Sequence, residues 1–404
     1  MRVRYAVAVA AVMVMNRISR LSGRGSGTVV GGKAGLKIDA KLLAELSERR
    51  STVLISGTNG KTTTTAFMAA ALRTRGPVAT NATGSNMPAG HVAALVEHRD
   101  AFQVALEVDE AYLAHSIVAT HPDAIVLLNL SRDQLDRMNE VRKLAERWRT
   151  ALEGYSGIVI ANADDPMVVH ATRAVAKTIF VEAGLVWSDD AIGCPSCGGE
   201  IVFGHGWACD ACDLDQPPAR WRREGKRVFA LDQQRGNLEI SIPGSFNVDN
   251  ALLVVAASEA LGLDVGAVCS ALTSVGTVAG RFEHRSIGGV DAELMLAKNP
   301  AGWAALLAMV AGQSNPIVVS INARIADGAD PSWLWDVDFS QLAGRTVIAS
   351  GDRWRDLSVR LDYADVAHHC EPDSRQAVLR AGHGGGRVVA MANYTAFGDL
   401  RKLS

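Results

Sequence analysis

The chain contains the glycine-rich run Gly57-Thr58-Asn59-Gly60-Lys61-Thr62-Thr63, from which its architecture can be inferred. It follows the apolar segment Val53 to Ser56 and precedes the helix-favouring segment Thr65 to Leu72. A strand, a glycine-rich turn and a helix start form a phosphate cradle, because glycines let backbone N–H groups close on phosphate oxygens and a lysine adds charge. We therefore expect an ATP site in which the Thr62 hydroxyl reaches a magnesium ion. Its residues would be Thr58, Asn59, Gly60, Lys61, Thr62 and Thr63.

One position departs from the general P-loop pattern. The pattern wants a glycine where this chain has Ile55, so the loop is a variant. A glycine-lysine turn that binds no ligand is the alternative interpretation. The strand before the loop and the helix after it favour phosphate binding.

Length and composition limit the class of protein. A chain of 404 residues exceeds what one hydrophobic core usually organises, so two or three domains are expected. With 48% hydrophobic residues, 21% charged residues and a net charge of -2, the chain has the composition of a globular protein. It has no basic excess, and we expect no nucleic-acid partner.

Apolar runs alternate with segments long enough for crossover helices. Strand-like runs occur at Thr52–Ser56, Phe102–Val108, Ala124–Asn129 and Gly157–Ala161. This alternation predicts an α/β fold with a parallel sheet, whose ligands collect at the carboxyl ends of the strands. The P-loop would lie at one such end.

Further strand-like runs follow in the second half of the chain. They are Arg227–Leu231, Leu238–Ile242, Pro316–Ile321, Thr346–Ser350 and Gly386–Met391. The last three alternate with helical segments again and predict a second α/β domain of Rossmann-like type. We expect an N-terminal helix and loop at 1–38, a central P-loop domain at 39–283 and a C-terminal domain at 284–404.

The N-terminal segment is apolar from Tyr5 to Met15 and begins with Arg2 and Arg4. It is too short to span a bilayer, and no small-residue cleavage site follows it. We expect a helix packed on the protein, followed by a loop at Gly23–Gly35. A secretion signal and a contact between the arginines and an anionic membrane surface stay open as alternatives.

Two Cys-x-x-Cys pairs are inserted in the central domain, at about 190–215. Four thiolates on two tight turns form a tetrahedral zinc site, so a structural zinc ribbon is predicted. A redox dithiol is less favoured because the pairs lie close together, and His205 is an alternative ligand. The four predicted ligands are Cys194, Cys197, Cys209 and Cys212.

Acidic residues stand where a strand is expected to end. Glu107-Val108-Asp109-Glu110 closes the run that begins at Phe102. A magnesium ion that bridges ATP oxygens needs a carboxylate at this edge, and we assign Glu107 to it. Asp133 follows the next strand, where it could equally cap a helix.

Five motifs occur in the order seen in Mur ligases. They are Gly57–Thr63, Glu107–Glu110, Asn129–Arg137, Asn162–Pro166 and Gly244–Ala251. The chain thus resembles the Mur ligase family over roughly residues 40 to 300. Mur ligases convert a carboxylate and ATP to an acyl phosphate, which an amine then attacks. The resemblance implies that Lys61 and Thr62 hold the phosphates and magnesium, that Glu107 binds magnesium, and that Asn247, Asn250 and Arg281 lie at the nucleotide.

Three departures narrow the resemblance. Gln134 stands where amino-acid-adding members have a histidine. They carry Ala-His-Asn-Pro near the second domain boundary, where this chain reads Leu296-Ala297-Lys298-Asn299-Pro300-Ala301-Gly302, and the cysteine ribbon is unusual for them. All three resemble the MurT branch of the family, which works with a glutaminase subunit called GatD. The stretch Asp327–Phe339 also resembles the C-terminal domain of that branch.

That resemblance implies an amidotransferase of peptidoglycan synthesis. The α-carboxyl of D-glutamate in the lipid II stem peptide would be activated by ATP and amidated to D-isoglutamine, with ATP, Mg2+ and Zn2+ as cofactors. Cys269 and Cys370 do not lie in a glycine-flanked nucleophile turn, so this chain shows no glutaminase of its own. A GatD-like partner would supply the ammonia from glutamine.

In this branch an aspartate of the C-terminal domain is thought to orient the partner's catalytic histidine. Asp336, Asp330 and Asp327 are the candidates. We rank Asp336 first because Trp333 and Trp335 lie beside it and could anchor an interface. The alternative is that the aspartates cap turns while the tryptophans belong to the core.

Two other functions stay open. One is a Mur-type or folylpolyglutamate-type ligase that adds an amino acid without a partner. The other is a nucleotide-gated binding module that performs no chemistry. We expect a cytoplasmic protein, with contact to the inner face of the plasma membrane as an open alternative.

Overall fold

The computed structural model describes residues 2–21, 28–81, 84–132, 141–276, 281–328 and 330–403. They fall into two compact units. The first contains the residues up to Leu130 together with Val141–Ile242 and Phe246–Gly276. The second contains the residues from 281 onward, and Ser131, Arg132 and Pro243–Ser245 are grouped with it.

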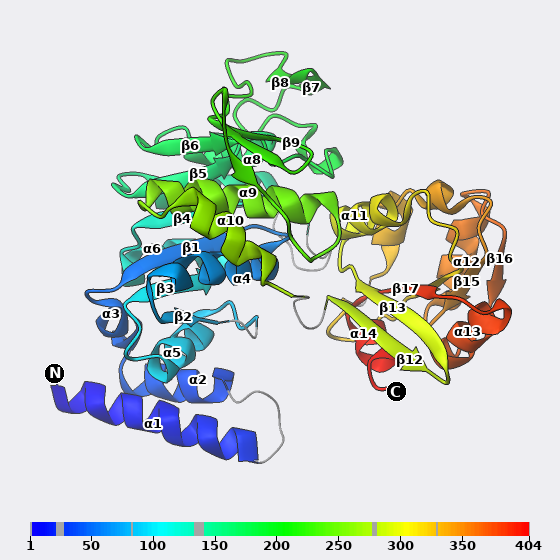
Figure 1. Ribbon diagram of the computed structural model, residues 1–404, viewed down its shortest axis with the longest axis horizontal. Helices are drawn as coiled ribbons and strands as arrows, with labels where there is room; N and C mark the ends of the chain where they lie inside the picture. Colours follow the sequence, from blue (N-terminus) through cyan, green and yellow to red (C-terminus); the bar gives the residue numbers. More distant parts are fainter. Residues whose placement is uncertain are drawn as a thin grey trace. The chain divides into compact units, whose positions relative to one another are not determined.

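The first unit is built on a nine-stranded sheet of order β11-β10-β9-β6-β5-β4-β1-β3-β2 (Figure 1). The parallel strands are β1 (Ser51–Ser56), β2 (Val78–Thr80), β3 (Gln103–Glu107), β4 (Ala124–Leu127), β5 (Ile158–Asn162), β6 (Thr178–Val181) and β9 (Trp221–Glu224). β10 (Arg227–Ala230) and β11 (Gln233–Asn237) extend it as antiparallel strands. The four strands predicted in this half of the chain and their parallel pairing are confirmed.

Helices cover both faces of this sheet, as expected for buried parallel strands. The helices are α3 (Leu42–Ser47), α4 (Lys61–Leu72), α5 (Pro88–Glu97), α6 (Leu113–Thr120), α7 (Val141–Leu152), α8 (Pro166–Thr172), α9 (Ser245–Ala260) and α10 (Val265–Thr273). The central strands are almost entirely buried and consist mainly of branched aliphatic residues. The core lies between them and the helices and includes Trp148.

Two helices precede the sheet, α1 (Arg2–Leu21) and α2 (Thr28–Ile38). The expected helix is confirmed, but the loop expected at Gly23–Gly35 is wrong for its described part, which lies in α2. The glycines that suggested a loop serve close packing instead. A Cβ on Gly31 would lie 2.1 Å from Asn16 Oδ1, and one on Gly32 would lie 1.8 Å from the Ala89 carbonyl oxygen.

The strand expected at Leu238–Ile242 is also wrong. The chain reverses at Leu231, whose φ is 53°, and β11 begins at once at Gln233. A tight hairpin fixes which residues pair, so the polar segment after the turn becomes the edge strand. Leu238 and Ile242 are buried without being part of a strand.

A small two-stranded sheet, β7 (Ile201–Gly204) and β8 (Gly206–Cys209), belongs to the cysteine-rich insertion. Hydrogen bonds join the insertion to the rest of the first unit. Trp207 Nε1 donates a hydrogen bond to the Ala163 carbonyl at 3.0 Å, and Arg142 Nε donates to the Pro195 carbonyl at 3.1 Å.

The second unit has a six-stranded sheet of order β12-β13-β17-β14-β15-β16. Its strands are β12 (Phe282–Ile287), β13 (Val290–Leu296), β14 (Ile317–Ser320), β15 (Val347–Ser350), β16 (His368–Cys370) and β17 (Val388–Ala392). β12 and β13 form an antiparallel hairpin, and every other pair is parallel. Its helices are α11 (Pro300–Val310), α12 (Trp354–Asp362), α13 (Ser374–Ala381) and α14 (Tyr394–Leu400). The three strands predicted here are confirmed.

Candidate active site

The P-loop joins β1 to α4 and needs its glycines. Gly57 has a φ of 149° and Gly60 a φ of 85°, which residues with a Cβ rarely adopt. A Cβ on Gly57 would lie 2.8 Å from Leu128 Cβ, and one on Gly60 would lie 2.9 Å from Asn250 Nδ2. The loop therefore delivers the N-terminal N–H groups of α4, a favourable position for phosphate.

Lys61 is the first residue of α4 and is almost fully buried. Its Nζ donates to the carbonyls of Gly57 at 2.5 Å and Thr58 at 3.1 Å, and to Glu110 Oε1 at 3.0 Å. Burial raises the pKa of Glu110, although the Lys61 ammonium acts in the opposite direction. A phosphate in the loop would compete with these oxygens for the ammonium.

Glu107 ends β3, and one of its carboxylate oxygens makes no hydrogen bond to a described residue. Its backbone N–H donates to Asn81 Oδ1 at 2.8 Å, and its Oε1 accepts from Asn86 Nδ2 at 3.3 Å. Oε2 is buried and has no hydrogen-bond partner among the described residues. A buried carboxylate oxygen of this kind is suited to a divalent cation, since Mg2+ prefers oxygen ligands.

Asn129, two residues after the end of β4, holds the P-loop in place. Its carbonyl oxygen accepts from Thr58 N at 2.9 Å, and its side chain exchanges two hydrogen bonds with the Asn59 backbone at 2.9 and 3.1 Å. The two side-chain bonds fix the loop conformation without using the N–H groups at the start of α4. Asp133 and Gln134, in the same sequence motif, lie outside the described residues.

Asp165 supports the same edge of the sheet. It lies in the motif Asn162–Pro166, but no role was assigned to it from the sequence. It is the N-cap of α8, where it accepts from Met167 N and Val168 N, and its other oxygen accepts from Leu130 N at 2.8 Å. Burial raises its pKa to about 6. The signal was available, since an aspartate followed by a proline commonly starts a helix.

Other buried groups at this edge were also missed. Asn81 Nδ2 and His91 Nε2 both contact the Glu107 carbonyl oxygen, each at 2.8 Å. Burial lowers the pKa of His91 to about 4. The sequence gives no signal for them, because their positions depend on β2 and α5 lying beside β3.

The remaining predicted nucleotide residues divide between the two units. Asn247 and Asn250 lie one turn apart on α9 and are buried, and Asn250 packs against Gly60. Thr62 and Thr63 lie in the first turn of α4. Arg281 belongs to the second unit, directly before β12, and its role at the nucleotide stays a prediction.

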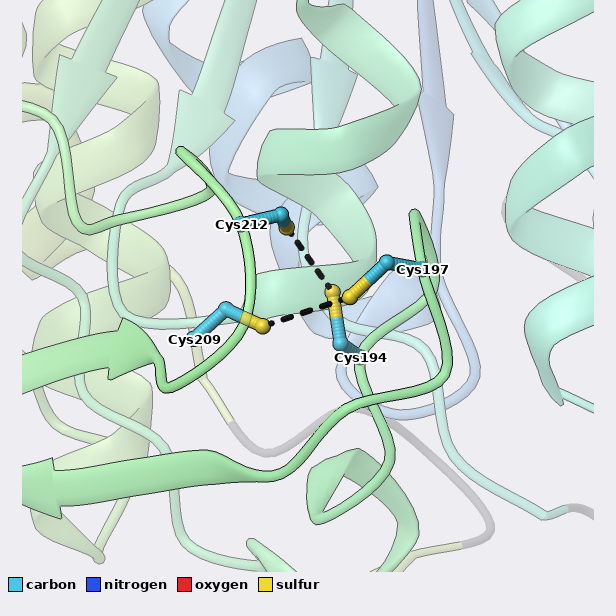
Figure 2. Close-up of side chains that lie close together, drawn as sticks. All are labelled: Cys194, Cys197, Cys209 and Cys212. Atoms are coloured by element: carbon cyan, nitrogen blue, oxygen red, sulfur yellow. Dashed lines mark hydrogen bonds between the residues drawn. The ribbon is translucent and has the colours of Figure 1, made fainter.

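The four cysteines of the insertion converge (Figure 2). The Sγ atoms of Cys194 and Cys212 are 3.7 Å apart, those of Cys197 and Cys209 are 3.5 Å apart, and all four lie within 4.8 Å of one another. A tetrahedral zinc with Zn–S bonds of about 2.3 Å needs sulfur separations of about 3.8 Å. The geometry and the four sulfur donors fit a zinc ion that leaves no open coordination position.

The three candidate aspartates of the second unit differ sharply. Asp327 is buried and accepts from Arg324 N at 3.1 Å and from Thr395 N at 2.8 Å. Asp330 is exposed and accepts from Ser332 N at 2.9 Å. These contacts hold local turns.

Asp336 ends a short 3-10 helix, Ser332–Asp336, and its side chain is 34% exposed. Its carboxylate pairs with Arg132 at 3.3 Å. Of the two neighbouring tryptophans, Trp333 stacks on a core tryptophan, whereas Trp335 is half exposed and packs edge-on against Tyr363. The interface role considered for both tryptophans is therefore open only to Trp335.

Comparisons with known proteins agree with this architecture. The family model described as Mur ligase middle domain matches residues 55–258, and the one described as MurT ligase C-terminal matches residues 296–397. The chain is 28% identical to the lipid II isoglutaminyl synthase (glutamine-hydrolyzing) subunit MurT of Streptococcus pneumoniae, over 95% of this chain and 93% of the relative. It is also 28% identical to the same-named subunit of Staphylococcus aureus, over 95% and 94%.

A solved structure shows the same fold. The pseudomurein peptide ligase type C of Methanothermus fervidus superposes with a TM-score of 0.68 at 19% identity, over 90% of this chain and 80% of that one. At this identity the likeness concerns the fold alone.

Proposed function

Since the chain belongs to the Mur ligase family and has the C-terminal domain of its MurT branch, we propose that it is the ATP-consuming subunit of a lipid II isoglutaminyl synthase. The reaction would activate the α-carboxyl of D-glutamate in the stem peptide as an acyl phosphate. Ammonia would then displace phosphate and leave D-isoglutamine. The single observation that carries the proposal is the open Glu107 oxygen beside a P-loop whose lysine is held by exchangeable oxygens.

ATP would lie with its phosphates at the start of α4, between Lys61 and Thr62. Glu107 and Thr62 would hold a magnesium ion, which when bound offsets the negative charge of the phosphates. Lys61 would exchange its contacts with Gly57 and Glu110 for phosphate oxygens and stabilise charge on the transferred group. Asn129 would keep the loop in shape, and Asn247, Asn250 and Arg281 would contact the nucleotide.

A GatD-like glutaminase partner would supply the ammonia. We assign Asp336 as the residue that orients the partner's catalytic histidine, because its carboxylate is accessible and lies beside an exposed aromatic pair. Asp327 is buried and accepts hydrogen bonds from Arg324 N and Thr395 N. Asp330 is exposed and accepts only a local hydrogen bond from Ser332 N among the contacts described above. Arg132 would have to release Asp336 for the partner.

We assign the remaining parts as follows. The cysteine insertion at 190–215 would be a structural zinc ribbon, supported by its sulfur geometry. The second unit would be a Rossmann-like domain, supported by its five consecutive parallel strands. The domains would extend over 1–38, 39–283 and 284–404. A lipid-linked substrate would bring the protein to the inner face of the plasma membrane.

The test is reconstitution with a glutaminase partner, ATP, magnesium, glutamine and lipid II, with the product mass as readout. Conversion of a carboxyl to an amide lowers the mass by about one unit, and it should need every component. Lys61→Ala should abolish it, while Lys177→Ala, an exposed lysine of the same unit, should not. A mass gain equal to one amino acid would instead indicate a partner-free ligase, and absence of ATP turnover would indicate a binding module.

A further inference from the structure

Helix α1 uses only one of its apolar faces for packing. Ala8, Val9 and Val12 are buried in the core of the first unit, where α1 contacts α2 and α5. The opposite side presents large apolar side chains that are between 47% and 81% exposed. They are Val3, Val7, Met13, Val14, Ile18 and Leu21.

These exposed side chains form a continuous stripe. At 3.6 residues per turn, Val3, Val7, Val14, Ile18 and Leu21 share one face of α1. The stripe runs over the whole helix of 20 residues, or about 30 Å at 1.5 Å per residue. A continuous exposed apolar surface of this length is typical of a site that binds another molecule or a membrane. Among the described residues no helix is both long and apolar enough to cross a membrane.

The charged residues of α1 and α2 are all basic. α1 contains Arg2, Arg4, Arg17 and Arg20 and no acidic residue, and α2 adds only lysines, although the whole chain has a net charge of -2. Arg20 pairs with Glu97 at 3.0 Å, but both side chains are at least 40% exposed, so the pair is weak. Arg17 is exposed beside the stripe.

We propose that α1 docks the protein on an anionic phospholipid surface, with its apolar stripe below the headgroups and the exposed Arg4, Arg17 and Arg20 at the lipid phosphates. Long arginine side chains suit this arrangement, because their stems stay in the apolar layer while their heads reach the phosphates. A second copy of α1 fits less well, since it would bring four more arginines and no carboxylate. The purpose of this docking, access to a lipid-linked substrate, rests on the proposed function.

The test is flotation of the full chain with vesicles of phosphatidylglycerol and phosphatidylcholine in equal parts, and with vesicles of phosphatidylcholine alone. We expect binding to the mixed vesicles and at least tenfold weaker binding to the neutral ones. The double variant Val7→Glu with Val14→Glu should lose at least about tenfold in binding, because two carboxylates enter the stripe. Arg17→Gln should lose about fivefold, on the mixed vesicles only. Val118→Glu, at a 72% exposed valine of α6, is the matched control and should bind as the parent does.

Two controls separate this proposal from the proposed function. Vesicle binding is measured without ATP or substrate, and amidation is measured separately on detergent-dispersed lipid II. Parental amidation in detergent by the double variant shows that it is folded, and its loss with vesicle-embedded substrate supports docking. The proposal is overturned if the parent protein does not bind the mixed vesicles. It is also overturned if the double variant binds them as well as the parent does, or if the parent binds neutral vesicles equally well. A concentration-dependent dimer that the double variant abolishes would assign the stripe to a second copy instead.

Discussion

Both units contain a mainly parallel sheet. They differ in whether the polar side chains at the carboxyl ends of the strands are hydrogen-bonded to one another. In the second unit, Asn322 after β14 and Asn393 after β17 bind each other, and Asp327 is engaged by Thr395. In the first unit, Glu107 Oε2 at the end of β3 has no hydrogen-bond partner among the described residues, and Lys61 contacts main-chain oxygens that a ligand could replace. Polar groups that satisfy one another maintain a fold, whereas groups left open at the same edge are available to a ligand.

The contrast has one exception in the second unit. Asn299, after β13, caps α11 with its oxygen, while its buried Nδ2 has no partner among the described residues. Lys298 beside it lies 5.1 Å above the ring of Tyr394. The polar groups after β14 and β17 therefore satisfy each other, whereas the Asn299 amide after β13 is not satisfied by any described residue.

The largest expected effect concerns the accessible aspartate of the second unit. Asp336→Asn should lower glutamine-dependent amidation about 10⁴-fold, as expected when the group that orients a catalytic histidine is lost. Amidation with added ammonium salt should stay at the parental rate, because the ATP site is untouched. Asp338→Asn, two residues away at an exposed turn cap, is the control. Loss of both activities in Asp336→Asn would assign the residue to the chemistry of this subunit or to its folding.

The next effect concerns the open edge itself. Glu107→Gln should lower ATP-dependent amidation about 10²- to 10³-fold and raise the magnesium concentration for half-maximal rate, because a neutral amide is a weaker cation ligand. The melting temperature should stay close to that of the parent, since Oε2 makes no hydrogen bond within the described chain. Glu48→Gln, an exposed glutamate of the same unit, should behave as the parent. An unchanged magnesium requirement would remove Glu107 from the metal site.

A substitution at Asp327, in the hydrogen-bonded edge of the second unit, should change the free energy of unfolding rather than the activity. Asp327→Asn replaces an acceptor oxygen with an amide that faces the donors Arg324 N or Thr395 N, and it should destabilise the second unit by about 3 kcal/mol. Urea unfolding of the whole chain measures this change. Asp330→Asn, at an exposed position, should change the free energy of unfolding by less than about 0.5 kcal/mol. A fully stable Asp327→Asn protein that had lost activity would contradict the structural role given to Asp327.

The smallest effect is a pH dependence at the open edge. Burial lowers the pKa of His91 to about 4 in the folded protein, below the value of an unfolded chain. The unfolded chain therefore takes up the proton first, and stability is lost as pH falls. This should cost about 2 kcal/mol between about pH 7 and about pH 5. His91→Gln, whose amide can still donate to the Glu107 carbonyl, should remove that contribution, and an identical pH profile in both proteins would contradict it.

Much of this fold was predictable from local signals. Eight of the nine predicted strands were placed correctly, and the P-loop was recognisable from its glycines, whose positive φ values confirm why only glycine fits. The glycines of α2 led to the wrong prediction of a loop, because glycine also permits close packing between helices. Asp327 is hydrogen-bonded by its neighbours, whereas Glu107 Oε2 has no partner among the described residues. This difference depends on residues distant in sequence and could not be deduced from local sequence.

Activation of the carboxylate by ATP can be tested directly by following the oxygen atoms of the substrate. The stem-peptide carboxyl is labelled with a heavy oxygen isotope, and the phosphate released during amidation by the complete enzyme is analysed by mass spectrometry. Activation as an acyl phosphate predicts one labelled oxygen in each phosphate molecule formed together with an amide. Phosphate without label, at a normal rate of amidation, would contradict the claim that this chain activates the carboxylate with ATP.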